Sequence, residues 1–207
     1  GASNIQGCRN FEPIVVPFKR VAVQRETQGL SVAAKNLQAC AQPYEKIVMF
    51  TAQYGLGMIP DNIVGTMLVA PKSWFWLIRM HPLSRPMIPI WVDLLKKAGV
   101  ENYDINLVNE LDINESIVVA DHVVCSFSST AYETILAGKP CTITTELGFE
   151  CMEDEIKNEN MNYATDVAGI IDSIESPSLP NMRQQDSTAL GYGDIFERIA
   201  GCHSVDG

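Results

Sequence analysis

The sequence has no apolar run that approaches the roughly 20 residues of a membrane-spanning helix. It also lacks a charged N-terminal region followed by an apolar stretch, so it carries no visible signal peptide. The first residues, Gly1-Ala2-Ser3, are typical of a cloning remnant, and no initiator Met precedes them. We therefore expect a part of a longer, cytoplasmic protein without an integral membrane segment.

Basic residues are fewer than acidic residues. Lys and Arg number 15 against 25 Asp and Glu, which gives a formal net charge of -10. A nucleic acid or an anionic membrane surface would require a basic face, so this charge argues against both partners. It does not exclude an anionic small ligand, because such a site needs only local hydrogen-bond donors.

Metal-site patterns are absent as well. The three histidines are scattered and no HExxH or CxxC pattern occurs, so we expect no metal site. The even count of six cysteines permits disulfides, but Cys125 and Cys141 lie in β-prone apolar runs and are typical of small core residues. We favour reduced cysteines and hence an intracellular compartment.

The sequence does contain enough apolar residues for a core, and a repeated order of β-prone and helical segments. Hydrophobic residues make up 46% of the 207 residues, enough for one large domain or one domain with a tail. Apolar runs predict strands at 46–51, 74–80, 102–108, 121–125 and 141–144. Composition and periodicity predict helices at 61–69, 88–98, 114–120, 129–137 and 163–174. This alternation predicts an α/β fold around a mostly parallel sheet with right-handed crossovers.

The same pattern divides the chain into three segments. Residues 1–44 are an N-terminal extension, with an edge strand at 21–23 and a helix at 30–41 that Ser31 can cap. Residues 45–175 form the α/β domain, in which the acidic stretch 150–162 is expected to be a solvated loop or a frayed helix start. Residues 176–207 are a linker and a C-terminal helix at 194–200 that packs back on the domain.

A cluster of hydroxyl residues at 126–130 separates the predicted strand 121–125 from the next helix. The N-terminus of a helix presents unpaired N–H groups and the positive end of the helix dipole, which favour a phosphate. Capping of the helix explains one serine, but three successive hydroxyls exceed what a cap requires. We therefore predict that Ser128, Ser129 and Thr130 contact the phosphate or nucleotide part of a ligand.

Glu133 lies one turn into the same predicted helix. Its carboxylate can accept hydrogen bonds from a ribose or sugar hydroxyl, which makes it a further nucleotide-binding candidate. It can equally complete a capping box with Ser129 or Thr130. Both interpretations stay open from the sequence.

A second pattern, Arg79-Met80-His81-Pro82, ends the predicted strand 74–80. Proline stops the strand and disfavours helix at His81, so the imidazole is held in an extended turn at the carboxyl edge of the sheet. From there it can donate a hydrogen bond to a phosphate or act as a general acid towards a leaving group. The alternative is a partly exposed turn histidine without a ligand. His81 is our catalytic candidate, and Arg79 is a candidate for the donor phosphate.

Two further loops carry candidate residues. Residues 51–57 form a glycine-bearing loop, but no GK[ST] follows and the GxGxxG spacing is not met, so an ordinary turn is slightly favoured. Gly55 in this loop is kept as a candidate phosphate contact. Asn109-Glu110-Leu111, after the predicted strand 102–108, is a candidate for contact with a base edge.

Together, the His-Pro pair at 81–82, the Ser-Ser pair at 128–129 and the turn 137–140 resemble the donor-binding half of GT-B glycosyltransferases. The pattern looks like that of the bacterial polysialyl-, Kdo- and CDP-glycerol-type transferases. The resemblance covers about residues 45–145. It implies a Rossmann-like parallel sheet with helices on both faces, one half of a GT-B architecture. It also implies that His81, Ser128 and Ser129 engage the phosphate of a cytidine nucleotide, without a metal.

The function implied by this resemblance is transfer of a CMP- or CDP-linked sugar or polyol phosphate to a glycan acceptor in polysaccharide biosynthesis, with no cofactor besides the donor. The segment before the first strand is too short for the second GT-B domain, so we expect the acceptor site and catalytic base on a second domain or subunit. Two alternatives stay open. One is a UDP-sugar transferase or a sugar-nucleotide epimerase relative, and the other is a non-catalytic binding module of the same fold.

Overall fold

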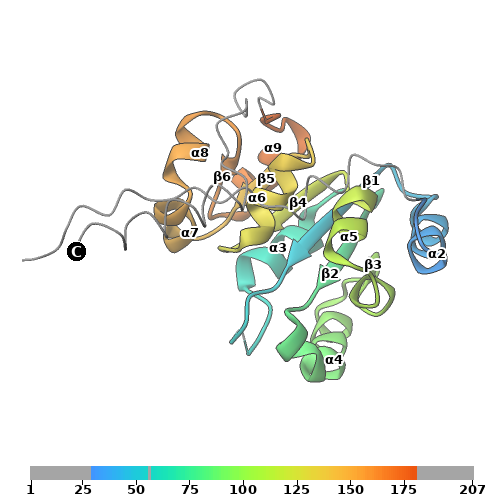
Figure 1. Cartoon of the computed structure of the whole chain (residues 1–207). Coiled ribbons are helices and arrows are strands. Elements are labelled where there is room, and N and C mark those ends of the chain that lie inside the picture. The colour runs from blue at the N-terminus through green and yellow to red at the C-terminus, as the bar shows by residue number, and fades with distance from the viewer. Residues whose placement is uncertain (1–28, 56, 181–207) are drawn as a thin grey trace, which may run out of the picture. The chain divides into compact units, whose positions relative to one another are not determined.

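The computed structural model describes residues 29–55 and 57–180 of the chain. In this part, six parallel strands form one sheet in the order β3-β2-β1-β4-β5-β6 (Figure 1). Their bounds are β1 Lys46–Thr51, β2 Trp74–Arg79, β3 Tyr103–Asp104, β4 His122–Cys125, β5 Cys141–Ile143 and β6 Asn162–Tyr163. The predicted edge strand at 21–23 and helix at 194–200 lie outside the described residues. The predicted parallel sheet is confirmed.

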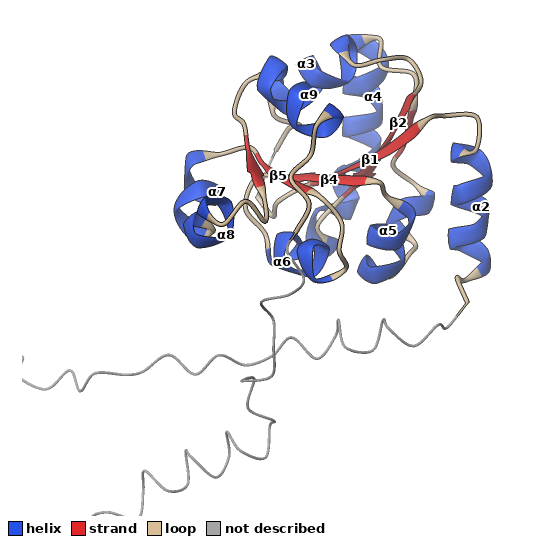
Figure 2. Ribbon diagram, turned by 90° about the horizontal axis from the view of Figure 1, so that it is seen from above, coloured by secondary structure: helices blue, strands red, loops and turns tan. Residues whose placement is uncertain are grey.

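Helices cover both faces of this sheet, with α3, α4 and α9 on one side and α2, α5 and α6 on the other (Figure 2). The bounds of the described helices are α2 Val32–Ala41, α3 Asp61–Val69, α4 Ile88–Ala98, α5 Ile113–Val119, α6 Ser129–Leu136, α7 Glu146–Cys151, α8 Glu153–Lys157 and α9 Val167–Glu175. Two 3-10 helices, η2 (Pro82–Met87) and η3 (Leu107–Asn109), follow β2 and β3. This strand order with helices on both faces is Rossmann-like, as expected.

The helix ends follow from capping residues that the sequence displays. Ser31 begins α2, and its hydroxyl accepts a hydrogen bond from the N–H of Ala34. Gly99 ends α4 in the left-handed region, with φ 84°, a conformation that glycine adopts without steric cost. The predicted helix at 30–41 and the predicted stop at Gly99 are therefore both confirmed.

The structure differs from three of the sequence predictions. The strand expected at 102–108 is limited to Tyr103–Asp104, because the Asp104 carboxylate accepts the N–H groups of Leu107 and Val108 and turns the chain into η3. The stretch 150–162, expected to be a solvated loop or a frayed helix start, instead contains the end of α7, the whole of α8 and the first residue of β6. No residue of α8 is buried, so apolar periodicity could not reveal it. α9 also starts later than predicted, because Asp166 caps it.

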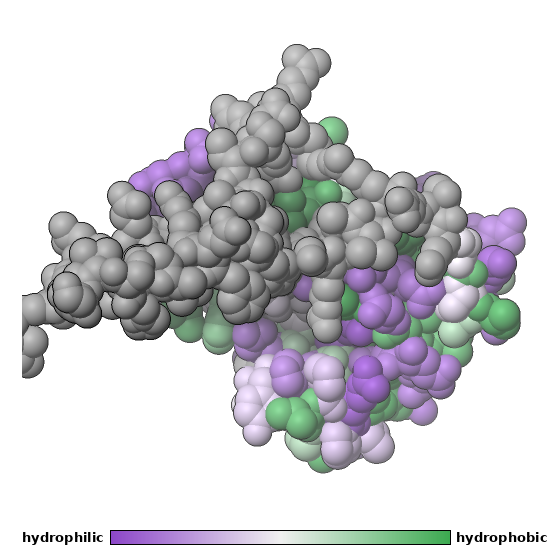
Figure 3. Space-filling view, viewed as in Figure 1, coloured by the Kyte–Doolittle hydropathy of each residue, from purple (hydrophilic) through white to green (hydrophobic). Residues whose placement is uncertain are grey.

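The surface of the described part is mixed in character. Figure 3 shows hydrophilic and hydrophobic residues interspersed where this part is visible on one face. Among the described helices, none combines the length and the apolar character required to cross a bilayer.

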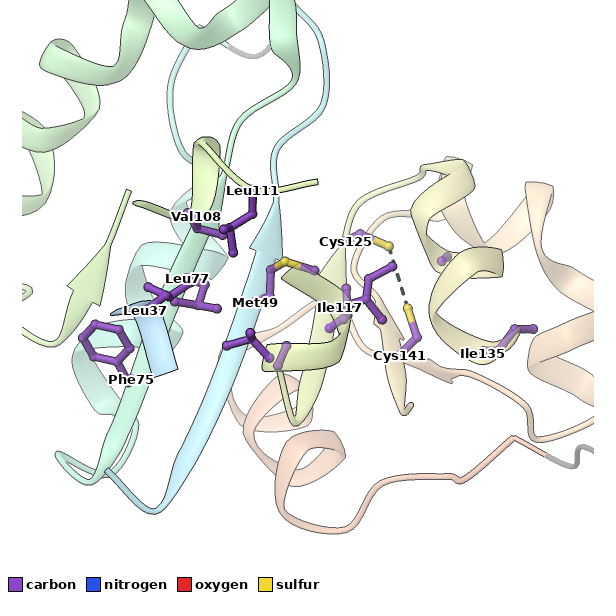
Figure 4. Packing of buried hydrophobic residues seen from close by; sticks show 14 of the residues in the cluster. Leu37, Met49, Phe75, Leu77, Val108, Leu111, Ile117, Cys125, Ile135 and Cys141 are labelled. Carbon is purple, nitrogen blue, oxygen red and sulfur yellow. Dashed lines mark hydrogen bonds between the residues drawn. The ribbon is translucent and has the colours of Figure 1, made fainter. Parts of the chain in front are cut away.

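Buried apolar side chains form one cluster on each face of the sheet, because successive strand residues point to opposite sides. Met49 belongs to the cluster under α2, α5 and α6, which Figure 4 shows, whereas its neighbours Val48 and Phe50 belong to the opposite one. Cys125 and Cys141 are fully buried free thiols in the Figure 4 cluster, with their Sγ atoms 3.9 Å apart. Their predicted role as small core residues is confirmed.

One polar chain interrupts the opposite cluster. The Ser173 hydroxyl donates its one hydrogen to the carbonyl of Ile170, so it accepts the hydrogen bond from the Thr142 hydroxyl. Because the hydrogen of Thr142 is used in this way, Nε2 of His122 donates to Thr142, at 2.7 Å. The neutral imidazole therefore carries its proton on Nε2, while the buried Nδ1 has no partner among the described residues. Burial, assisted by the charge of Lys46, lowers the pKa of His122 to about 3.

We expect this histidine to make the protein acid-sensitive. Its folded pKa lies below the ordinary 6.5, so its stabilising contribution is complete above pH 6.5 and is lost as the pH falls towards 3. Urea unfolding measured across this range should show wild type losing up to about 1.4 kcal/mol more per pH unit than His122→Gln, which keeps an amide donor but does not titrate. Parallel pH profiles for the two proteins would contradict this assignment.

Candidate functional site

The register of the strands sets four loops at one edge of the sheet. Thr51 at the end of β1 pairs with Arg79 at the end of β2 and with Cys125 at the end of β4, and Cys125 pairs in turn with Ile143 at the end of β5. The strand order reverses between β1 and β4. In open α/β sheets, ligands bind at the carboxyl edge beside such a reversal. The two sequence patterns, at His81 and at Ser128, follow the strands on either side of β1.

The loop after β4 ends in a capped helix. Ser128 is the N-cap of α6, and its hydroxyl accepts the N–H of Thr130 and lies 3.1 Å from the hydroxyl of Thr130. Capping thus accounts for Ser128, as one of the sequence interpretations proposed. Ser129 is exposed at the first position of the helix, where an anion would meet the positive end of the helix dipole.

Glu133 lies on the buried side of α6, with 5% of its surface exposed. A capping box with Ser129 or Thr130 is wrong, because the N-cap is Ser128 and the third helical residue is Ala131. The Glu133 carboxylate instead lies near Arg79, whose pKa is lowered mainly by burial and raised in part by the charge of Glu133. The fold therefore brings together two predicted site residues that are 54 positions apart.

His81 begins η2 directly after β2. Its Nδ1 accepts the backbone N–H of Leu83 at 3.2 Å, so the neutral ring carries its proton on Nε2. Nε2 is then a hydrogen-bond donor that does not require protonation of the ring. The geometry favours binding of an anionic oxygen by His81 over removal of a proton by it. Among the described residues, no hydrogen bond joins His81 to Ser128, Ser129 or Thr130.

Asn109 supports this turn from inside. Its Oδ1 accepts the N–H of Met80, and its Nδ2 donates to the carbonyls of Ile78 and Ile105. The side chain is buried and these bonds occupy both amide hydrogens, so within the predicted segment 109–111 the contact with a base edge is wrong for Asn109. Its role is to fix the backbone on both sides of Arg79, immediately before His81. The sequence did not reveal this role, because the clamp joins segments about 30 residues apart.

Arg79 points its guanidinium into the protein. One Nη donates to the Val108 carbonyl at 2.6 Å and to the Ser116 hydroxyl at 2.8 Å, and the other donates to the Leu111 carbonyl at 3.0 Å. These bonds join β2 to η3 and to α5. An anion at the edge would therefore meet the positive charge of Arg79 more than its donors, because these donors are used inside the domain. Burial lowers the pKa of this guanidinium.

The loop after β1 contributes a residue that the sequence analysis missed. Gly55 turns the chain with φ 85°, and the preceding residue, Tyr54, packs its ring against His81 with centroids 5.3 Å apart. Tyr54 is 63% exposed. The sequence signal for Tyr54 was its position in a glycine turn at the end of a strand. Its contact with His81 could not be predicted, because His81 follows another strand.

The loop after β4 is braced by α7. The Thr145 hydroxyl donates to the Ser126 carbonyl at 3.0 Å and also caps α7 by accepting the N–H of Gly148. Gly148 approaches the same carbonyl so closely that a Cβ would collide with it. This contact holds the loop against the end of β5.

The site is an open edge rather than an enclosed cavity. A groove of about 480 Å³ lies elsewhere, between α4 and the edge strand β3, and contains none of the predicted site residues. No group of three or more His, Cys, Asp or Glu side chains within the described ranges could hold a metal ion.

Gly148→Ala tests the brace on the loop after β4. The added Cβ collides with the Ser126 carbonyl, so α7 must move and the free energy of unfolding should fall by about 1–3 kcal/mol in urea titrations. Gly57→Ala is the control, because nothing lies within 4 Å of its added Cβ, and its effect should stay within about 0.5 kcal/mol. Equal stability of the two variants would show that the loop does not depend on this contact.

Arg79→Lys tests the hydrogen bonds that the Arg79 guanidinium makes inside the domain. Lysine cannot reproduce the planar donors, so at least one buried carbonyl loses its partner, and we expect a loss of about 2 kcal/mol in the free energy of unfolding. Arg85→Lys, on the exposed side of η2, should be near neutral in the same measurement. A similar small effect for both variants would refute the structural role of Arg79.

No protein-family model and no curated protein sequence matches the chain. Solved structures do resemble it. One is HepE of Anabaena in complex with UDP and glucose, with 12% identity, a TM-score of 0.51, and coverage of 72% of this chain and 43% of HepE. Another is the UDP-GlcNAc 2-epimerase of Methanocaldococcus jannaschii in complex with UDP-GlcNAc and UDP, with 12% identity, a TM-score of 0.56, and coverage of 89% and 50%.

The chain spans half or less of the length of these two proteins. At such low identity the likeness concerns the fold and not the chemistry of the site. The chain thus folds as a Rossmann-like α/β domain that corresponds to one half of a GT-B architecture.

Proposed function

We propose that the chain is the donor-binding domain of a glycosyltransferase, which holds a nucleotide-sugar at the carboxyl edge of the sheet. The observation that carries this proposal is the position of two anion-binding features, the Nε2 donor of His81 and the N-terminus of α6, after the two strands that flank β1. Neighbouring strands lie about 4.8 Å apart, so the two features start about 10 Å apart. A nucleoside diphosphate can bridge this separation.

In this proposal the predicted site residues are either ligand contacts or supporting residues. Ser129 and Thr130, with Ser128 as the cap, receive a phosphate at the start of α6, whereas Glu133 is 5% exposed and supports the site from within the domain. Arg79 supplies positive charge from within, and Gly55 lets the loop after β1 approach the donor. With a sugar donor, the bond that breaks joins the sugar to a phosphate oxygen. With a polyol-phosphate donor, it is the P–O bond of the diphosphate that links the transferred phosphate to the nucleotide. In both cases Nε2 of His81 stabilises the charge that develops on the departing nucleotide phosphate. No metal is needed for this role.

The acceptor glycan and the base that deprotonates it belong to a second domain or subunit in this proposal. The open edge and the half-length coverage of HepE and the epimerase support such an arrangement. The free, buried thiols of Cys125 and Cys141 support a reducing compartment, and we place the reaction in the cytoplasm.

Two donor classes compete. The short motifs favour a cytidine-activated sugar or polyol phosphate. A UDP-sugar transferase or an epimerase relative is the second candidate, because the HepE and epimerase structures contain UDP or UDP-GlcNAc. The nucleobase that the protein prefers, cytosine or uracil, distinguishes these candidates.

Calorimetric titration with CMP, CDP, UMP, UDP and GDP tests the proposal. We expect saturable binding of a cytidine or uridine nucleotide, and His81→Ala should weaken it about 10-fold or more, because a hydrogen bond to a charged group is lost. Leu83→Ala is the control on the same turn, since its side chain has no donor. A cooperatively folded wild type that binds no nucleotide would overturn the proposal and leave a non-catalytic interaction module.

A further inference from the structure

The turn that follows β2 carries a second cation besides Arg79. Arg85 lies in η2, the 3-10 helix that begins at His81, and is exposed. The pKa of Arg79 is lowered by burial first and by the charge of Arg85 second, so the two guanidinium groups lie near each other. Within the described ranges, no carboxylate forms an ion pair with Arg85. This end of the edge therefore carries positive charge that can bind an anion beside Nε2 of His81.

The start of α6 is a second anion-binding feature, on the other side of β1. Ser129, at the first helical position, is exposed, and the first turn contains no acidic residue. The N–H groups and the helix dipole there favour negative charge. Because β2 and β4 both pair with β1, about 10 Å separates the strands from which the two features start. A single phosphate, which binds through hydrogen bonds of about 2.9 Å, can occupy one of these features but does not reach both.

Between the two features, β1 ends in a buried hydroxyl. Thr51 pairs with Arg79 on one side and with Cys125 on the other, and 5% of its surface is exposed. It lies on the same face of β1 as Met49, the face that α6 covers (Figure 2), because alternate strand residues share a face. Among the described residues, its Oγ1 has no hydrogen-bond partner. Such a hydroxyl is costly to bury, which indicates a partner that arrives with a ligand at the edge.

We propose that this edge binds a nucleoside diphosphate rather than a nucleoside monophosphate, and that Arg85 and Thr51 are further binding residues. One phosphate lies at the start of α6 and the other between Nε2 of His81 and the Arg85 guanidinium, so the diphosphate crosses the end of β1 at Thr51. The donor is then a CDP- or UDP-linked compound and not a CMP-linked sugar. This assignment holds for either direction of the nucleoside along the edge. It rests on the proposed function and narrows its donor class.

Calorimetric titration with CMP and CDP, and with UMP and UDP in parallel, tests the inference in wild type and in one variant for each end of the diphosphate. Wild type should bind the diphosphate about 10-fold or more tightly than the monophosphate, because the second phosphate adds hydrogen bonds to charged groups. Arg85→Gln removes the cation at one end. Ser129→Glu places a carboxylate at the other end, where it stabilises the helix but repels a phosphate.

Each of these two variants should weaken binding of the diphosphate about 10-fold, whereas the monophosphate, which occupies one end, should respond to only one of them. Lys96→Gln is the matched control, because it removes the same charge from an exposed position in the last turn of α4. It should bind both nucleotides as wild type does.

Thr51→Val tests the middle of the site. Valine has nearly the shape of threonine but no hydroxyl, so the free energy of unfolding in urea should not fall, since the lost group has no partner in the free protein. Binding of the diphosphate should nevertheless weaken about 3- to 10-fold, because the hydroxyl meets the ligand.

Each other outcome identifies what failed. Equal affinities of wild type for mono- and diphosphate overturn the inference, as does a diphosphate affinity unchanged by Arg85→Gln, by Ser129→Glu or by Thr51→Val. A monophosphate weakened by both end variants, or a loss in Lys96→Gln equal to that in Arg85→Gln, overturns it as well. All of these results leave the proposed function standing, because a nucleotide still binds. Absence of nucleotide binding in wild type overturns the proposed function and this inference with it.

Discussion

The pairing of β1 with β2 on one side and β4 on the other is the constraint on which the rest of the structure depends. These ladders set Thr51, Arg79 and Cys125 level with one another. A slip of one residue would move every side chain of a strand to the other face and so disrupt the packing of both buried clusters. Because both faces of the sheet are buried, the register has no close competitor. The loops that carry Tyr54, His81 and Ser128 therefore emerge at one edge.

Polar contacts inside the domain then hold these loops. Asn109 clamps the backbone before His81, Arg79 joins β2 to η3 and α5, and Thr145 binds the carbonyl of Ser126. Each contact satisfies backbone groups that would otherwise be buried without a partner. Ser129 and Arg85, which are proposed to meet the ligand, are left at the surface by this framework. A rigid support below an open edge suits the precise placement of a binding site.

Much of the fold could be predicted from the sequence. The strands 46–51 and 121–125 and the helix 61–69 appear at or within one residue of the expected positions, because apolar runs and capping residues act locally. The two-residue strands β3 and β6 could not be bounded in this way, since their hydrogen bonds depend on a neighbouring strand. Of the candidate site, the sequence predicted His81 and the Ser128–Thr130 cluster, but not Tyr54 as a neighbour of His81.

By itself, then, the sequence determined the alternation of strands and helices, the breaks at Pro82 and Gly99, and the positions of the candidate site residues along the chain. Only the tertiary structure decided their partners. Asn109 became a clamp rather than a ligand contact, Glu133 acquired Arg79 as a neighbour, and the proton of His122 was assigned to Nε2. The physical reason is that hydrogen bonding and burial of a polar group depend on segments distant in sequence, whereas helix and strand formation depends mainly on adjacent residues.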